Sequence, residues 1–493
     1  MAKRSSVMAA WGLALLMAVP ALAVAQQSLR VDLQLEPPHL DPTRTASATT
    51  AETTHRNVFQ GLTRIDRHGK VRPALAQRWE VSEDGLKYRF WLRQGVRFHD
   101  GQRFDAEVAA YSLRRLLSEA AGNPQRLLYQ AIREVEVAGS HSLVLHLSRP
   151  DSLLPFRLGL SAAVMVHPAS EPTNASRPVG TGPYAFQGWE RGEGVALAAF
   201  AEYWGEAPAI ERATFTYTSN RLELEGGLAE GLIDLYPDAS SLTSHLALSH
   251  RADYRILDGF SEGEVIMAVN HAREPFADRR VRRALAHAVN REALLEIYPA
   301  ITPPLIGSHF SPGHPAYVDL ADRYPHDPQR ARELLADAGH AEGLSLTLTV
   351  PPTQYAELSS LYIASDLEAV GIEVALQRVS WPQWLEQVFN DREYDLTIVA
   401  HVEPMDIDIY ARDDYYFNYR DPRFQALWTQ IEAAQEPEAR HALLGEAQRH
   451  LAEEAVNVFL FLKPQQAIHK VGLTGVWSNA PIPAVVLQEL EWE

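Results

Sequence analysis

Apolar and polar residues alternate over three short stretches in the last third of the chain, and two helical patterns separate these stretches. Residues 344–350, 372–377 and 394–400 have the alternation of strands. Residues 356–370 and 381–390 carry apolar side chains at helical spacing. A strand–helix–strand–helix–strand order predicts parallel strands joined by right-handed crossovers. The predicted fold class is therefore α/β.

The loops that follow these three strands are the predicted binding surface. In an open α/β sheet, ligands bind beyond the carboxyl ends of the strands, so residues 351–355, 380–381 and 401–408 are expected at one edge. Aromatic rings with a few convergent polar groups are typical of a ligand pocket. The candidate ligand contacts from these loops are Tyr355, Trp381, His401, Glu403, Asp406 and Tyr410.

Each candidate also has an ordinary structural explanation, which the sequence leaves open. Glu403 can be a solvated loop acid, and His401 can be a structural residue whose ring nitrogens are satisfied. Asp406 belongs to a residue type that often caps or hydrogen-bonds its own loop. The aromatic residues of 410–419 are expected to pack within the protein, with Tyr410 as the exception.

The first part of the chain predicts a lobe with an additional compact unit. Residues 28–35 alternate as a strand, and the prolines that follow end it near His39, a candidate ligand contact from this side. Residues 54–62 have the pattern of a helix. Residues 73–150 form a separate unit of strands and one helix, for which Asp105 is the expected N-cap.

The length of 493 residues exceeds what one hydrophobic core supports, so two lobes are expected. Residues 26–258 are assigned to lobe 1 and residues 259–465 to lobe 2, with the crossing near 260–269. Residues 466–493 are expected to return to lobe 1.

Residues 1–25 have the pattern of a secretory signal peptide. Lys3 and Arg4 precede an apolar run that is too short to span a bilayer, and residues 23–25 (AVA) form a small-x-small cleavage site. The sequence contains no Cys, so neither disulfides nor a lipid-acceptor cysteine are available. We therefore expect a soluble protein that is exported to the periplasm.

The charge of the chain argues against nucleic acid as a partner. The formal net charge is −18, and removal of Lys3 and Arg4 with the signal peptide makes it −20. Such a chain repels the phosphates on which nucleic-acid binding depends. It also repels anionic lipid surfaces, and solubility is the simplest explanation of the charge.

Motifs for catalysis, nucleotides and metals are weak. Residues 180–182 (GTG) are followed by Pro and Tyr and not by a helix, so phosphate binding is not predicted. GxSxG, HExxH and a nucleophilic Cys are absent, and histidines such as 309 and 314 are five apart, which does not place both on one helical face. No catalytic residue, cofactor or dedicated metal site is predicted, and a metal that arrives inside a chelate stays open. A secreted hydrolase acting on glycans or peptides is kept as the alternative function.

Several short motifs, in order along the mature chain, resemble the peptide/nickel family of periplasmic solute-binding proteins that serve ABC importers. Each motif alone is modest, and together they extend over nearly the whole mature chain. They are residues 40–42 (LDP), 73–76 (PALA) with Trp79, 95–101 (GVRFHDG), 178–184 (PVGTGPY), 203–205 (YWG), Asn270 with 276–282 (FADRRVR), and 419–422 (YRDP).

This resemblance implies a two-lobe periplasmic-binding-protein fold whose lobes are joined by two crossovers that act as a hinge. It also implies an extra small domain in the first lobe, which the unit at 73–150 matches. The lobes of such proteins close around a ligand. The implied partners are a small-molecule ligand, peptide or peptide-like, and an ABC permease in the inner membrane, with the protein itself a monomer.

The resemblance also implies roles for individual residues. In the dipeptide- and oligopeptide-binding members, an Asp in the loop after the third strand of lobe 2 pairs with the amino group of the ligand. Glu403 occupies the matching place and can accept the same charge-assisted hydrogen bond. In the dipeptide binder an Arg after the first of the three strands binds the ligand carboxylate, but residues 351–355 (PPTQY) contain no Arg. Dipeptides, longer peptides, peptide-like compounds and glycan-derived ligands therefore stay open.

Overall fold

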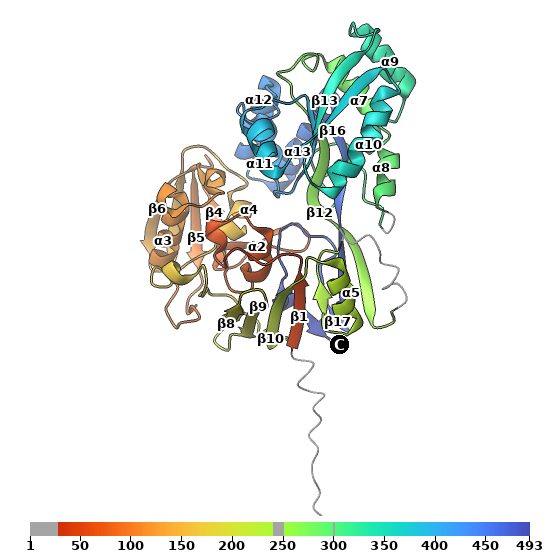
Figure 1. Cartoon of the computed structure of the whole chain (residues 1–493). Coiled ribbons are helices and arrows are strands. Elements are labelled where there is room, and N and C mark those ends of the chain that lie inside the picture. Colours follow the sequence, from red (N-terminus) through yellow and green to blue (C-terminus); the bar gives the residue numbers. More distant parts are fainter. Residues whose placement is uncertain (1–27, 240–250, 299–300) are drawn as a thin grey trace, which may run out of the picture.

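The protein consists of two lobes joined by a pair of long strands (Figure 1). The computed structural model describes residues 28–239, 251–298 and 301–493, so the expected signal peptide at residues 1–25 lies outside the described part. Among the described helices, none has both the length and the apolar character needed to cross a bilayer. The predicted two-lobe α/β fold is confirmed.

One ten-stranded sheet runs through both lobes. Its longest members, β12 and β16, pair antiparallel from Tyr254 opposite Lys470 to Met267 opposite Val458. Because this pairing continues past the lobe boundary, the two strands connect the lobes. In spatial order the strands are β14 (Ile372–Arg378), β13 (Leu344–Val350), β15 (Leu396–His401), β12 (Tyr254–Val269), β16 (Val458–Lys470), β11 (Leu235–Tyr236), β1 (Ser28–Leu33), β10 (Arg212–Tyr217), β9 (Gly194–Ala199) and β8 (Tyr184–Glu190).

Lobe 2 contains the strand–helix–strand–helix–strand unit that the sequence predicts. β13 pairs parallel with both β14 and β15, and the crossovers contain α10 (Gln354–Glu368) and α11 (Trp381–Trp384). α11 continues as a π-helical turn over Leu385–Asn390, so the predicted helix at 381–390 is irregular in its second half. Since the strands are parallel, their carboxyl ends lie at the same edge of the sheet.

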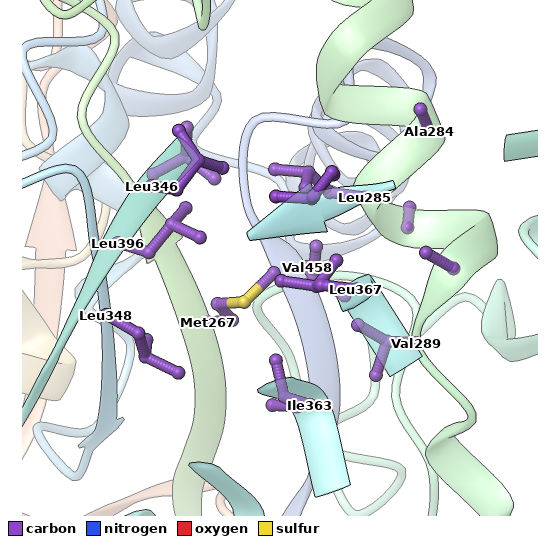
Figure 2. Packing of buried hydrophobic residues seen from close by; sticks show 14 of the residues in the cluster. Met267, Ala284, Leu285, Val289, Leu346, Leu348, Ile363, Leu367, Leu396 and Val458 are labelled. Carbon is purple, nitrogen blue, oxygen red and sulfur yellow. The ribbon is translucent and has the colours of Figure 1, made fainter. Parts of the chain in front are cut away.

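A hydrophobic core lies between this sheet and two helices of lobe 2 (Figure 2). Leu346 and Leu348 of β13 belong to the same buried cluster as Leu285 of α7 (Arg279–Ala288) and Ile363 of α10. Full burial of such a side chain is worth about 1.5–3 kcal/mol. The alternation in β13 therefore reflects this packing, which fixes the edge from which the binding loops extend.

Lobe 1 carries the small unit as a separate antiparallel sheet. Its strand order is β4-β5-β7-β6, and Asp105 caps the adjacent helix α3 as predicted, because its side chain accepts hydrogen bonds from the N–H groups of Glu107 and Val108. The bounds of these and the remaining elements are β2 (Thr63–Ile65), β3 (Val71–Pro73), β4 (Ala76–Val81), β5 (Lys87–Leu92), β6 (Ile132–Gly139), β7 (Ser142–Leu147), β17 (Leu473–Thr474), β18 (Glu491–Trp492), α2 (Ala48–Thr54), α3 (Ala106–Leu117), α4 (Leu154–Arg157), α5 (Arg221–Ala229), α8 (Arg291–Leu294), α9 (Pro328–Asp337), α12 (Pro422–Ala433) and α13 (Pro437–Glu454).

The predicted helix at 54–62 is wrong, because the helix in this region is α2 and it ends at Thr54. The following backbone is instead used in long-range pairing. Gly182 donates its N–H to the carbonyl of Val58 at 2.9 Å, and Tyr184 donates to Asn57 at 2.9 Å. These partners come from more than a hundred residues away, so a local helical pattern could not reveal them.

The crossing between the lobes is marked by a bulge. In the β12–β16 ladder, Phe260 lies opposite Pro464 and Glu264 lies opposite Leu462, so three residues of β12 face a single residue of β16. A bulge re-aims side chains and bends the strand. The C-terminal segment also lies here, because Phe260 donates to the side chain of Asn479 at 3.2 Å and accepts from the N–H of Ala480 at 3.2 Å.

A glycine permits this close approach, and its replacement is a test of the crossing. A Cβ on Gly259 would collide with the backbone carbonyl of Ser478. We expect Gly259→Ala to lower the free energy of unfolding by about 1–3 kcal/mol, the usual cost of overpacking. Urea denaturation measures the change. The control is Gly226→Ala in α5, where an added Cβ meets no atom within 4 Å; equal stability of the two variants would contradict the close approach.

Candidate functional site

A cavity of about 100 Å³ lies between the two lobes. His68 and Phe156 line it from lobe 1, and His314 and Met405 line it from lobe 2. Glu262, which comes from the bulge of β12, lines it at the crossing. The cavity therefore combines both lobes and the connection between them, as expected of a site that forms when the lobes close.

The loop after β15 forms part of the cavity wall. β15 ends at His401, and Met405 turns the chain in the left-handed region with φ of 63°. A 3-10 helix over Asp406–Ala411 follows, and its residues Ile407 and Ile409 are buried in lobe 2. These two apolar side chains anchor the loop, so the neighbouring polar residues have a fixed position.

Two histidines meet at Asp406. His309 Nε2 lies 2.7 Å from Asp406 Oδ1, and His401 Nδ1 lies 3.3 Å from Asp406 Oδ2. The histidines are 1% and 5% exposed, so this is a buried polar cluster. Burial alone would raise the pKa of Asp406, but the charges and hydrogen bonds of His309 and His401 hold that pKa below its ordinary value.

In each of the two imidazole rings, the nitrogen that faces away from Asp406 lies within hydrogen-bond distance of a tyrosine hydroxyl. Tyr410 OH lies 3.3 Å from His309 Nδ1, and Tyr416 OH lies 3.0 Å from His401 Nε2. Tyr410 also accepts a hydrogen bond from Asn457 at 3.1 Å. The predicted candidate Tyr410 is only 1% exposed, so in this structure it holds a histidine within the core and does not form the cavity surface.

Two more carboxylates lie beside this cluster. Glu264 lies opposite His401 in the β12–β15 register, and its Oε2 atom has no hydrogen-bond partner in the structure. Burial, together with the charge of Asp406, raises the pKa of Glu264 well above its ordinary value. Burial also raises the pKa of Glu262 to about 7, although Ser311 donates a hydrogen bond to it at 2.8 Å. Sequence reasoning missed both glutamates, because the bulge that sets their direction leaves no pattern in the sequence.

Two of the predicted candidates lie on neighbouring loops, as expected. The hydroxyl of Tyr355, at the start of α10, accepts the N–H of Ala400 at 3.0 Å and so ties the loop after β13 to β15. Glu403 is exposed on the loop after β15, and its carboxylate accepts the N–H of Val402 at 3.3 Å. The charge of Glu403 contributes to the raised pKa of buried Glu264, so Glu403 belongs to the same acidic region.

The other two candidates contact mainly their own neighbours. Trp381 is 39% exposed and its ring meets that of Trp384 edge-on at 5.6 Å. His39 in lobe 1 is half-buried, and its Nδ1 accepts the N–H of Asp41 at 3.3 Å. Ligand contact by the predicted residues stays a prediction.

A second group of charges lies where lobe 1 meets the crossing strands. Lys463 of β16 pairs with Asp238 at 3.3 Å. The charge of Asp238 raises the pKa of Lys463, and Glu52 of α2 and Tyr355 of lobe 2 raise it further. Burial, reinforced by the charge of Asp238, raises the pKa of Glu52 to about 7. These residues come from distant segments, so no local spacing in the sequence indicates them.

Comparison with known families decides the class of this protein. Residues 70–421 match the family model of bacterial extracellular solute-binding proteins, family 5, middle region. The chain belongs to this family. The resemblance found in the sequence is confirmed, and the matches carry no support for the alternative of a hydrolase.

Curated relatives of this family 5 protein include two with named ligands. The glutathione-binding protein GsiB of Salmonella paratyphi A is 31% identical over 353 residues, which cover 69% of this chain and 67% of the relative. Di/tripeptide-binding protein 2 of Pseudomonas aeruginosa is 29% identical over 436 residues, which cover 79% of each chain.

Solved structures share the fold of this family 5 protein. HbpA2 from Haemophilus parasuis aligns with a TM-score of 0.84 at 19% identity, covering 94% of this chain and 100% of the other. The unliganded open form of the periplasmic murein tripeptide-binding protein MppA aligns with a TM-score of 0.82 at 20% identity, covering 95% of this chain and 97% of the other. At these identities the alignments establish the fold alone.

The raised pKa of Glu52 predicts a pH dependence of stability. A carboxyl whose pKa is higher in the folded than in the unfolded protein favours folding when protonated, so its contribution is lost as pH rises from about 4.5 through 7. We expect Glu52→Gln to lose less stability than the wild type between pH 5 and pH 8, by roughly 1–3 kcal/mol. Urea denaturation across this range measures the difference.

The control for this experiment is Glu193→Gln, which removes an exposed carboxylate in the turn between β8 and β9. Its pH profile should follow the wild type. A Glu52→Gln profile that also follows the wild type would show that the carboxyl at residue 52 titrates as it does in the unfolded chain.

Proposed function

We propose that this protein captures peptides or peptide-like solutes between its lobes and delivers them to an ABC permease in the inner membrane. The observation that carries the proposal is the cavity lined by both lobes and by Glu262 of the crossing strand, within a fold of the solute-binding family. In this proposal the mature protein is a periplasmic monomer that binds its ligand without converting it.

The crossing strands suit a closing motion. β12 and β16 hold both lobes through one continuous ladder, and the ladder is interrupted at the bulge between Phe260 and Glu264. Hinge motions are absorbed by a few residues whose backbone dihedrals change. We place the hinge at this bulge, next to the cavity.

The charges around the cleft favour a ligand that carries an amine. Glu403 is exposed near Glu264, and Glu262 lines the cavity itself. Lys463, at the crossing strand, is already paired with Asp238 and lies beside Glu52. The acidic side chains suit the amino group of a peptide, and relatives named for glutathione and for di- and tripeptides agree with this chemistry.

Ligand screening with small-angle X-ray scattering tests the proposed function. We expect glutathione or one of a panel of di- and tripeptides to raise the melting temperature, because a ligand that binds only the folded state stabilises it. Saturation with that ligand should also reduce the radius of gyration as the lobes close. Mass spectrometry should recover the ligand unchanged. A saturating ligand that leaves the radius unchanged would contradict closure, and recovery of a cleaved ligand would restore the hydrolase alternative.

Glu403→Gln tests the proposed partner of the ligand amine. The substitution keeps the shape of the side chain and removes its charge, so the ammonium group loses its counter-ion in the closed cleft. Truncating one partner of such a pair costs about 2–5 kcal/mol, or roughly 30- to several-thousand-fold in affinity. Calorimetry with the ligand identified above measures the change, and stability should stay close to that of the wild type because residue 403 is exposed.

The matched control for this variant is Glu368→Gln, which removes an exposed carboxylate at the end of α10 in the same lobe. Its affinity should equal that of the wild type. If Glu403→Gln also binds an amine-bearing ligand with wild-type affinity, the amine is held elsewhere and the assignment of residue 403 is wrong.

A further inference from the structure

The cluster of His309, His401 and Asp406 has the composition of a metal site. One ligand atom from each residue can be chosen so that all three lie within 4.8 Å of one another. Two imidazole nitrogens and a carboxylate form a ligand set typical of zinc. In a tetrahedral zinc site with bonds near 2.1 Å, ligand atoms lie about 3.4 Å apart. His309 Nε2 and Asp406 Oδ1, which are 2.7 Å apart, would therefore separate slightly to seat the ion, and no two of the three ligand atoms start more than 4.8 Å apart.

The outer contacts of the two rings match those of metal-binding histidines. A histidine that binds a metal through one nitrogen usually has its other nitrogen hydrogen-bonded, which fixes the orientation of the ring. Tyr410 occupies that place on His309 and Tyr416 occupies it on His401, at 3.3 and 3.0 Å. The other nitrogen of each ring is directed to the carboxylate of Asp406, and His401 Nδ1 also lies 3.5 Å from the hydroxyl of Tyr415.

A second observation is a buried carboxyl group beside the cluster, one oxygen of which has no hydrogen-bond partner. Glu264 is 4% exposed, and its Oε2 atom lacks a partner. Within the described residues, Asp406, Glu262 and Glu264 form no ion pair with a Lys or Arg side chain. Buried acidic groups normally have a cationic partner or coordinate a metal. A divalent cation at the histidines would offset this group of acids.

We propose that His309, His401 and Asp406 bind a divalent transition-metal ion, with zinc as the first candidate. Three protein ligands leave the fourth position of a tetrahedral ion open, as in zinc sites that hold a water molecule. Glu264, opposite His401 in the β12–β15 register, lies beside the proposed ion. Met405, the residue before Asp406, lines the cavity between the lobes, and the proposal places the entry of the ion from solvent on this side.

The same protein contains a natural comparison for the site. His450 Nε2 lies 2.7 Å from Asp421 Oδ2, which equals the distance between His309 and Asp406, and His450 is 6% exposed. This pair is a hydrogen bond between one buried histidine and one partly exposed carboxylate, which also accepts a hydrogen bond from Tyr419. It lacks the convergent second histidine, so the proposal predicts no metal there.

Cobalt(II) and zinc(II) added to the mature protein test the proposal. The protein is prepared without a polyhistidine tag, stripped with a chelator and titrated with cobalt(II), which gives intense visible absorption bands in four-coordinate sites. We expect these bands to saturate at one cobalt per chain and to disappear when zinc is added. Elemental analysis after dialysis against zinc should find one zinc per chain.

Substitution of single residues identifies which side chains bind the metal. His309→Gln and His401→Gln should abolish the cobalt bands and the bound zinc, whereas His450→Gln should keep both. Tyr416→Phe removes the outer hydrogen bond of His401 and should weaken zinc binding roughly 10- to 100-fold, the usual effect of altering such a contact. A purely structural role of the cluster would lower the melting temperature of these variants without any change in metal content.

Two results would overturn the proposal. One is a wild-type protein without cobalt bands whose zinc content equals that of His309→Gln. The other is a wild-type metal site that His309→Gln and His401→Gln leave intact. If those variants do not fold, X-ray absorption spectroscopy of the zinc-loaded wild type decides, because the proposal requires two imidazole ligands on the ion.

Discussion

Backbone hydrogen bonds between β12 and β16 hold together two lobes that each have their own core. In lobe 2 the sheet packs on α7 and α10, and in lobe 1 a separate buried cluster surrounds β1 and β10. Each core resists deformation because it is closely packed. In the proposed closure, we therefore expect relative motion of the lobes to be concentrated where the ladder loses its register, between Phe260 and Glu264. This places the moving part of the molecule next to the cavity and its acidic side chains.

The sequence predicted lobe 2 well, because its signals are local and strong. The alternation in residues 344–350 arises from leucines that enter one core, and β13 has these same bounds. The helix predicted at 54–62 was wrong because Asn57 and Val58 pair with the backbone of residues 182–184, which overrides a weak local pattern. Periodicity describes which face of an element is buried, but it does not describe which distant segment covers it.

The candidate site was predictable in its location and only partly in its residues. Parallel strands bring the loops after β13 and β15 together, and the hydrogen bond between Tyr355 and Ala400 joins them. His309 could not be found in this way, since it belongs to an irregular segment far from His401 in the sequence. Glu262 and Glu264 were also missed, because their positions depend on a bulge in a strand that the sequence shows only as a crossing.

The segment around residues 478–489 contacts both the crossing strand and the interior of lobe 1. It packs on the crossing at Gly259 and Phe260, where we propose the hinge, and further along it supplies Glu489, which pairs with buried Arg56 at 2.9 Å. A chain synthesised from its N-terminus acquires these contacts last. A product cut short before residue 478 would leave a buried cation unpaired in lobe 1 and the hinge without one of its supports.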